Sequence, residues 1–278
     1  MFTTLVTANE LAEHLDDADW IVFDCRFDLA EVEAGRLAYA RSHILGARYL
    51  HLDHDMAGPK TGTNGRHPLP DPQTFVARVA ELGLTNGMQA VAYDASGGYY
   101  AARLWWMLRW VGHAQCAVLD GGWDAWAKAG LPVTGDLPRI RAGAFSGTAR
   151  DTTVDARFIA ANLERPEATV IDARSADRFR GENETLDPVG GHIPGAINRF
   201  FKNNLTDNGY FKPAADLRVE YSRLIGDVAP QRVVHQCGSG VTACHNLLAM
   251  EIAGLPGSRL YPGSWSEWCS DPRRPVAR

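Results

Sequence analysis

Hydrophobic and polar positions along the chain follow the pattern of short buried strands that alternate with helices. Apolar runs at residues 20–23, 169–171 and 233–234 are brief and end in polar residues, as buried strands do. Other segments, such as residues 243–252, place apolar side chains at helical spacing. This order predicts an α/β fold in which a mainly parallel sheet is covered by helices on both faces.

The same pattern occurs twice in the chain. The stretch from Val6 to Arg26 resembles the stretch from Val154 to Arg174 without a gap. The matched pairs are Val6 and Val154, Ala8 and Ala156, Leu15 and Leu163, Asp24 and Asp172, and Arg26 and Arg174. The phrases SHILGA and GHIPGA follow, and AVLDGGWDAW later corresponds to RLYPGSWSEW. Several matches in one order indicate a tandem duplication of one domain.

The length of 278 residues also favours two domains. We expect an N-terminal domain at residues 1–135 and a C-terminal domain at residues 151–278. The stretch between them is rich in proline and glycine and lacks helical periodicity, so residues 136–150 are predicted to be a linker.

A glycine-rich loop in the second repeat carries the candidate chemistry. Cys237 follows a predicted strand and precedes a predicted helix, and Gly238 and Gly240 allow the intervening backbone to close tightly. Backbone N–H groups in such a loop, with the helix N-terminus behind them, form an anion-binding cradle. A cysteine at its mouth is expected to react as the thiolate. The first repeat has Ala95 at the corresponding position, which predicts a catalytically silent domain.

Composition narrows the classes of function. The net charge is −5 and no large Lys/Arg cluster is present, which argues against nucleic-acid binding. No apolar run is long enough to span a bilayer and no early segment has the pattern of a signal peptide, so we expect a cytoplasmic protein without membrane contact. The five cysteines are scattered without a CxxC pair, which argues against disulfides and a zinc site.

The repeated DxR motifs, HILGA and GHIPGA, LDGGW and above all CGSGVTA give the chain a family resemblance. It resembles the two-domain rhodanese-type sulfurtransferases over nearly its whole length. The Gly–Ser–Gly after Cys237 is similar to the 3-mercaptopyruvate branch. The thiosulfate branch typically carries a basic pair at the positions of Gly238 and Ser239, which suits a dianionic donor.

The resemblance implies a two-step sulfur relay. Cys237 attacks the sulfur of a small-molecule donor, pyruvate leaves, and a persulfide remains on the enzyme. A thiol acceptor such as a thioredoxin-like protein, or cyanide, then removes the outer sulfur. No metal or organic cofactor is implied.

The resemblance also implies which residues form the site. Arg178 matches a substrate-binding arginine of the family. The backbone N–H groups of the loop would stabilise the persulfide, and they belong to Gly238, Gly240, Val241 and Thr242. Members of the mercaptopyruvate branch commonly carry a second carboxylate-binding arginine further on, where this chain has Leu186 and Asp187. This departure leaves thiosulfate open as the donor.

Proton movement is assigned by the same resemblance to Ser239 and to His43, with Tyr99 as a further contact. A histidine suits this role because its charge changes near neutral pH. The competing interpretation is that His43 only anchors its loop, as its counterpart His192 would. Both interpretations stay open at this stage. Arg26 and Arg174 are predicted to tie strand ends to nearby carboxylates.

Three other functions compete with the mercaptopyruvate enzyme. A thiosulfate:cyanide sulfurtransferase and a persulfide carrier module that serves a partner protein both use the same cysteine loop. A cysteine-dependent phosphatase needs a loop closed by an arginine, whereas the sixth residue after Cys237 is Ala243. The phosphatase is therefore rejected. The other cysteines, at positions 25, 116, 244 and 269, are predicted to be structural.

Overall fold

The computed structural model describes residues 1–278 and divides into two compact units. Unit 1 comprises Met1–Gly58, Leu69–Asp151 and Asn208–Tyr210. Unit 2 comprises Pro59–Pro68, Thr152–Asp207 and Phe211–Arg278. The segment Pro59–Pro68, called the arm below, thus belongs to unit 2 although the chain on both sides of it belongs to unit 1.

Unit 1 contains a five-stranded parallel sheet in the order β1–β6–β5–β2–β4. Its strands are β1 (Leu5–Val6), β2 (Trp20–Asp24), β4 (Arg48–Tyr49), β5 (Gln89–Tyr93) and β6 (Cys116–Leu119). A separate antiparallel pair joins β3 (His43–Ile44) to β7 (Val133–Thr134). β5 lies inside the sheet and all five of its residues are buried, which explains its continuous apolar run.

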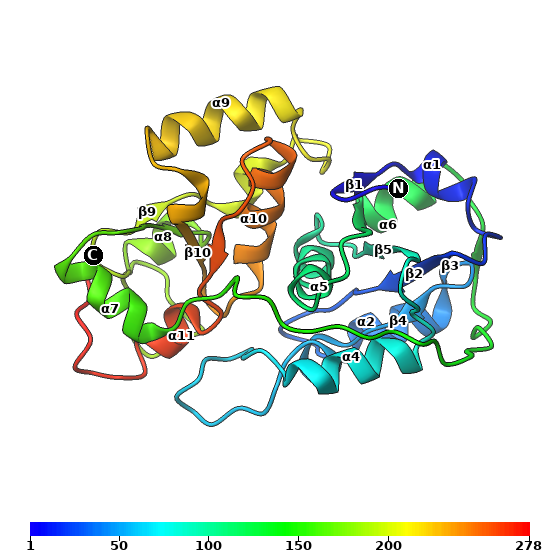
Figure 1. Ribbon diagram of the computed structural model, residues 1–278, viewed down its shortest axis with the longest axis horizontal. Coiled ribbons are helices and arrows are strands. Elements are labelled where there is room, and N and C mark those ends of the chain that lie inside the picture. The colour runs from blue at the N-terminus through cyan, green and yellow to red at the C-terminus, as the bar shows by residue number, and fades with distance from the viewer. The chain divides into compact units, whose positions relative to one another are not determined.

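Helices cover both faces of this sheet, with α1 and α6 on one side and α4 on the other (Figure 1). The helices of unit 1 are α1 (Ala8–Ala12), α2 (Ala34–Arg41), α3 (Leu52–Asp55), α4 (Pro72–Glu81), α5 (Tyr99–Trp110) and α6 (Gly122–Lys128). The core on the α1 and α6 side joins Val22 and Val91 of the sheet to Leu11 and Trp126 of these helices. Burial of these side chains is the main contribution to the stability of the unit.

Unit 2 repeats the design with a four-stranded parallel sheet in the order β11–β10–β8–β9. Its strands are β8 (Thr169–Asp172), β9 (Ile197–Asn198), β10 (Val233–Gln236) and β11 (Arg259–Leu260). Its helices are α7 (Ala156–Glu164), α8 (Ala176–Phe179), α9 (Ala214–Ile225), α10 (Thr242–Ile252) and α11 (Ser264–Trp268), with 3-10 turns at Phe201–Asn204 and Pro230–Arg232. Figure 1 shows α9 and α10 on one side of the sheet and α7 and α11 on the other.

The α/β fold and the internal repeat are both confirmed. In unit 1 the Arg26 guanidinium pairs with Asp24 at 2.6 Å and lies 4.3 Å from the ring centroid of Trp123. In unit 2 Arg174 pairs with Asp172 at 2.7 Å and lies 4.7 Å from the ring of Trp265. The predicted structural role of the two arginines is therefore confirmed, since each guanidinium pairs with the carboxylate at its own strand end.

Residues 136–150 contain no helix or strand and group with unit 1. The Ser146 N–H donates to Asn86 Oδ1 at 2.8 Å, and the Gly143 N–H donates to the carbonyl of Ala80 at 2.7 Å. This segment therefore runs along the surface of unit 1. Its function as a linker, and the domain limits at residues 135 and 151, stay predictions.

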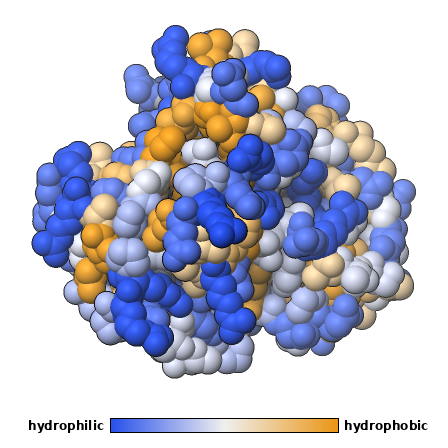
Figure 2. All heavy atoms as spheres, turned by 60° about the vertical axis from the view of Figure 1, so that its left-hand side comes forward, coloured by the Kyte–Doolittle hydropathy of each residue, from blue (hydrophilic) through white to orange (hydrophobic).

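None of the helices has both the length and the apolar character that a bilayer crossing requires. The face in Figure 2 mixes hydrophilic and hydrophobic residues. Large apolar side chains that are exposed come from separate parts of the chain, among them Leu137, Leu186 and Val219. Such scattered exposure is ordinary for a protein surface.

Candidate active site

The loop between β10 and α10 directs a backbone amide at the sulfur of Cys237. Cys237 follows the last residue of β10, and its side chain is buried. The Gly240 N–H donates to Cys237 Sγ at 3.2 Å. Gly240 has a φ of +78°, and a Cβ atom there would collide with the carbonyl oxygen of Pro262. Only glycine therefore allows this amide to face the sulfur.

A second layer holds the loop in place from behind. The Cys237 N–H donates to Ser264 Oγ at 3.1 Å. The N–H groups of Trp265 and Ser266, in the first turn of α11, donate to the carbonyls of Cys237 and Gly238 at 3.0 and 2.9 Å. Because its carbonyls and amides are already bonded, the loop is organised before any substrate arrives.

Ser239 is hydrogen-bonded to a histidine that the sequence interpretation did not select. Its hydroxyl lies 2.7 Å from His67 Nδ1, and both side chains are buried. His67 is part of the arm of unit 2. The arm is also fixed by the backbone N–H of Arg66, which donates to Ser266 Oγ at 3.0 Å. A serine and a histidine in contact can relay a proton at the edge of the cysteine loop.

His43 has different surroundings, inside unit 1. Its imidazole is fully buried, stacks on Tyr39 with ring centroids 4.0 Å apart, and contacts the Tyr39 carbonyl through Nδ1 at 2.7 Å. His192 in unit 2 repeats the arrangement, stacking on Phe179 and contacting its carbonyl at 2.9 Å. The structure thus gives His43 the contacts of a loop anchor, and His67 is the histidine hydrogen-bonded to Ser239.

Arg178 lies near the loop, at the end of the short helix α8. Its Nε and Nη2 atoms bind the Glu184 carboxylate at 3.1 and 2.8 Å, and its side chain is 21 % exposed. Although burial acts to raise it, the Arg178 guanidinium holds the pKa of Glu184 below its ordinary value. Asp187 is a second buried partner, 3.5 Å from Arg178 Nη2. Arg178 is therefore held by two buried carboxylates while part of its guanidinium stays accessible.

The remaining predicted residues lie at helix starts. Val241 is the N-cap of α10 and Thr242 is its first residue, so the loop leads directly into this helix. Tyr99 is the first residue of α5 in unit 1, where its ring lies 4.3 Å from that of Tyr100. The contribution of these three residues to substrate binding stays a prediction.

The corresponding loop of unit 1 is filled by one of its own side chains. Ala95 stands at the cysteine position, and the buried carboxylate of Asp94 accepts hydrogen bonds from the N–H groups of Ser96, Gly98, Tyr100 and Ala101 at 2.7–2.9 Å. The carboxylate of Asp94 thus occupies the amide cradle of this loop, and burial raises the pKa of Asp94 while these hydrogen bonds oppose the rise. The catalytic silence of the first domain stays a prediction.

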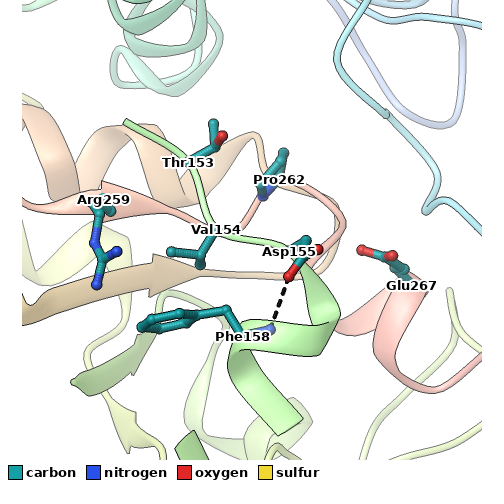
Figure 3. Close-up of a pocket in the computed structure, with 7 residues that line it drawn as sticks. All are labelled: Thr153, Val154, Asp155, Phe158, Arg259, Pro262 and Glu267. Atoms are coloured by element: carbon teal, nitrogen blue, oxygen red, sulfur yellow. Dashed lines mark hydrogen bonds between the residues drawn. The ribbon is translucent and has the colours of Figure 1, made fainter. Parts of the chain in front are cut away.

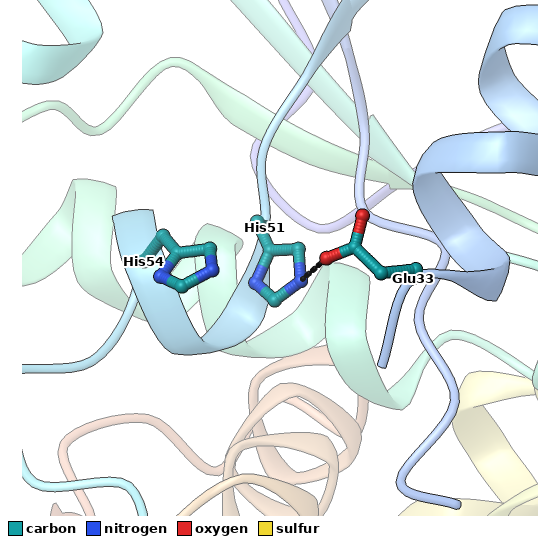
Figure 4. Close-up of side chains that lie close together, drawn as sticks. All are labelled: Glu33, His51 and His54. Atoms are coloured by element: carbon teal, nitrogen blue, oxygen red, sulfur yellow. Dashed lines mark ion pairs between the residues drawn. The ribbon is translucent and has the colours of Figure 1, made fainter. Parts of the chain in front are cut away.

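Two histidines and a glutamate of unit 1 lie close enough to suggest a metal site, as Figure 4 shows for Glu33, His51 and His54. His51 Nδ1 accepts the Asp53 N–H at 3.1 Å, so its proton is assigned to Nε2, which lies 3.1 Å from the Val32 carbonyl and 3.9 Å from Glu33. The His51 and His54 rings stack with their planes 28° apart. The lone pairs of stacked rings do not converge on one point, so hydrogen bonding accounts for this cluster.

A cavity of about 460 Å³ opens elsewhere in unit 2 (Figure 3). It is lined by Thr153, Val154, Asp155, Phe158, Arg259, Pro262 and Glu267. Asp155 caps α7 through the Phe158 N–H at 2.8 Å, and the Arg259 guanidinium lies 4.6 Å from the Phe158 ring centroid. None of the predicted site residues lines this cavity, and its charged groups serve local structure.

The sequence interpretation missed two residues of the arm, Arg66 and His67. The repeat directed attention to His43, because HILGA has a counterpart in GHIPGA. The arm contains no regular hydrophobic pattern, and the one available signal was its adjacent Arg and His in a proline- and glycine-rich loop, NGRHPLP. Only its contact with Ser239, 172 positions away in the sequence, identifies it as part of the site.

The chain is similar to known proteins along most of its length. The rhodanese-like domain family matches residues 7–129 and 155–271. A probable 3-mercaptopyruvate sulfurtransferase from Pseudomonas aeruginosa is 45% identical over 276 residues, which cover 98% of this chain and 97% of that protein. A putative thiosulfate sulfurtransferase, SseB, from Mycobacterium tuberculosis is 36% identical, with coverage of 99% and 96%.

Solved structures agree with these relatives. The 3-mercaptopyruvate sulfurtransferase from Leishmania major has a TM-score of 0.84 at 31% identity, covering 96% of this chain and 74% of that one. SseA from Escherichia coli, described as a 3-mercaptopyruvate sulfotransferase, has a TM-score of 0.83 at 29% identity, with coverage of 95% and 99%. The chain therefore belongs to the rhodanese family of sulfurtransferases, with two rhodanese-like domains in tandem.

Proposed function

We propose that this chain moves sulfur from 3-mercaptopyruvate to a thiol or cyanide acceptor through a persulfide on Cys237, with release of pyruvate. The observation that carries the proposal is the Gly240 N–H that faces Cys237 Sγ at 3.2 Å in a preformed loop. A backbone donor at this position favours an anionic sulfur, both as the thiolate and as the persulfide. The name of the Pseudomonas aeruginosa relative supports the choice of donor.

In the first step the Cys237 thiolate attacks the thiol sulfur of mercaptopyruvate. A sulfur–sulfur bond forms and the carbon–sulfur bond of the donor breaks. The electron pair of the broken bond passes to the carbon as the enolate of pyruvate, which takes up a proton. The donor carbon is reduced, the transferred sulfur becomes part of a persulfide, and no outside oxidant is needed.

In the second step the thiolate of the acceptor, or cyanide, attacks the outer sulfur of the persulfide. The sulfur–sulfur bond breaks and its electron pair returns to Cys237, which regenerates the thiolate. The products are an acceptor persulfide or thiocyanate. Either a small thiol or a thioredoxin-like protein can supply the required thiolate.

We assign the proton transfers of the first step to Ser239 and His67. Their contact at 2.7 Å allows the pair to take the proton of the donor thiol and to return one to the pyruvate enolate. His67 replaces His43 in this role, because the contacts of His43 are with Tyr39 in unit 1. Arg178 is assigned to the donor carboxylate.

The test compares the parental protein with Cys237→Ser. Parental protein treated with mercaptopyruvate is expected to gain about 32 Da, one sulfur atom, on the peptide that contains Cys237. Cys237→Ser is expected to show neither the added mass nor pyruvate release, with a parental circular dichroism spectrum. Rates with mercaptopyruvate and thiosulfate, compared as kcat/KM, decide between the two donors. Added mass from thiosulfate alone would contradict the proposed donor.

A further inference from the structure

We propose that Ser264 is a positioning residue for the Cys237 nucleophile, and that its strained backbone is retained because its hydroxyl holds the Cys237 N–H. This inference rests on the proposed function, since it takes Cys237 as the residue that carries the sulfur. It adds a residue that acts on the reaction through the cysteine loop.

The backbone of Ser264 has an unusual conformation. Its φ is +54°, and it is the one residue of this chain other than glycine with a positive φ. This left-handed region is unfavourable for an L-amino acid because its Cβ atom crowds the backbone, a cost that glycine avoids. Ser264 is also fully buried, at the first position of α11. Strain of this kind persists where the surrounding structure holds it, and it is concentrated at functional sites.

Unit 1 makes the same turn with glycine. Gly122 precedes Trp123 as Ser264 precedes the corresponding tryptophan, and Gly122 has a φ of +56° at the first position of α6. In both units the N–H of that tryptophan donates to a carbonyl of the strand-to-helix loop, that of Asp94 at 2.8 Å and that of Cys237 at 3.0 Å. The turn therefore requires only a backbone that glycine provides without strain. A side chain at this position in unit 2 needs a separate reason.

The hydroxyl of Ser264 supplies that reason. Its Oγ accepts the Cys237 N–H at 3.1 Å and donates to the Tyr261 carbonyl at 2.9 Å. The two bonds are compatible, because a hydroxyl that donates to a carbonyl keeps its lone pairs to accept an N–H. Glycine or alanine at residue 264 would remove this acceptor from a buried N–H group.

The Ser264 hydroxyl and the next amide hold Cys237 from both sides. Ser264 Oγ binds the N–H of Cys237, and the Trp265 N–H binds its carbonyl at 3.0 Å. Because the Cα atom lies between these two bonds, the direction of the cysteine side chain is fixed. Its Sγ then lies 3.2 Å from the Gly240 N–H. Release of the Cys237 N–H would let the side chain turn away from the amide that favours an anionic sulfur.

Two variants separate the hydroxyl from the strain. Ser264→Gly removes the hydroxyl and relieves the strain, whereas Ser264→Ala removes the hydroxyl and keeps the strained Cβ atom. The matched control is Ser270→Ala. The Ser270 hydroxyl donates to the carbonyl three residues earlier, that of Glu267 at 2.8 Å, as Ser264 does to Tyr261, but it does not bond to the cysteine loop.

Three quantities are measured for each protein. Steady-state kinetics with mercaptopyruvate give kcat and KM. The mass of the peptide that contains Cys237 gives the rate at which iodoacetamide alkylates this thiol, a reaction of the thiolate that needs no sulfur donor. Urea denaturation gives the midpoint of unfolding.

Both Ser264 variants are expected to lose about 10-fold in kcat and about threefold or more in the alkylation rate, as for loss of one buried hydrogen bond. KM is expected to stay within about threefold, because the hydroxyl acts on Cys237 and not on the donor. The urea midpoint of Ser264→Gly is expected to lie above that of Ser264→Ala, since only alanine keeps the strain. Ser270→Ala is expected to keep the parental kcat and alkylation rate.

A kcat and an alkylation rate of Ser264→Gly within about twofold of Ser270→Ala would overturn the inference. It would also be overturned if the loss followed stability, with Ser264→Ala far less active than Ser264→Gly, because the backbone and not the hydroxyl would then be responsible. A loss confined to KM would place Ser264 in donor binding and would overturn it as well.

The inference and the proposed function fail separately. If alkylation of Cys237 slows in both Ser264 variants but mercaptopyruvate leaves no sulfur on the parental protein, only the proposed function is lost. If the parental protein and Ser264→Gly form the persulfide and are alkylated at the same rates, only the Ser264 inference is lost.

Discussion

Two histidines of unlike origin in the sequence, His43 and His67, have different surroundings in the structure. His43 belongs to a repeated motif and lies against Tyr39 in the unit 1 core. His67 belongs to the arm and lies against Ser239. The repeated motif therefore indicated a histidine whose contacts are those of a loop anchor. Contact with a hydroxyl of the cysteine loop is the better indicator of chemistry.

For single substitutions of these two histidines we predict different consequences. His67→Gln is expected to lower kcat with mercaptopyruvate by about 10²- to 10⁴-fold, the usual effect of losing general acid–base catalysis, at a nearly parental KM. His43→Asn is expected to lower the melting temperature and to leave kcat within about threefold. Steady-state kinetics and thermal unfolding measure both effects. A larger loss of kcat in a fully folded His43→Asn would return the catalytic role to that residue.

At the scale of elements, the strand-to-helix loop is used in two ways. In unit 1 the loop after β5 wraps its amides around the Asp94 carboxylate. In unit 2 the residue before the cysteine is Gln236, and its neutral, buried side chain makes no hydrogen bond. The amide of Gly240 is then directed to Cys237 Sγ. The two loops thus differ in the side chain at the strand end: Asp94 fills the amide cradle of unit 1, whereas Gln236 leaves the amide of Gly240 to Cys237 Sγ.

Asp94→Asn is accordingly predicted to destabilise the protein without affecting catalysis. The amide nitrogen of Asn cannot accept the N–H groups that Asp94 now binds, so we expect a loss of about 1–3 kcal/mol in the free energy of unfolding. Urea denaturation and kcat/KM are the two measurements. Asp28→Asn serves as the control, because the exposed Asp28 also accepts backbone N–H groups, from Ala30 and Glu31. Equal effects at both sites would mean that the Asp94 cradle has no special importance.

The stability of the whole molecule is expected to depend on pH through a buried histidine. His235 in β10 is fully buried, and burial lowers its pKa to about 3. The unfolded chain binds a proton at this residue near its ordinary pKa of about 6.5, whereas the folded protein does not. The contribution of a neutral His235 is therefore complete above about pH 6.5 and is lost as the pH falls toward about 3.

The variant His235→Leu tests this linkage. Urea denaturation between pH 7 and pH 4 is expected to show that the free energy of unfolding of the parental protein decreases as the pH falls. His235 contributes about 1.4 kcal/mol per pH unit to this decrease below pH 6. That component is expected to be missing in the variant, because leucine does not titrate. Identical slopes for the two proteins would show that His235 does not control the acid response. Burial also lowers the pKa of His113 in unit 1. His113 is therefore expected to contribute to the pH dependence of the free energy of unfolding in both the parental protein and His235→Leu.

The features of this protein that depend on local residue types are readable from the amino-acid sequence. Apolar runs and their spacing predict the strands and helices, the repeated motifs predict the two domains, and Cys237 followed by Gly238 and Gly240 predicts the reactive loop. The strands, the helices and the loop each depend on a short run of neighbouring residues, where backbone sterics and hydrophobic periodicity act directly, and the repeat is a second copy of the same local patterns.

Which side chains lie near Cys237 depends on long-range packing in the folded protein. Arg66 and His67 meet the loop because the arm packs with unit 2, and the bond from His67 to Ser239 spans 172 positions. A contact of that range depends on the burial and hydrogen bonding of the completed fold, and no local pattern encodes it. The position of Arg66, which pairs with Asp187 and lies beside Gly238, could therefore be read only from the folded chain.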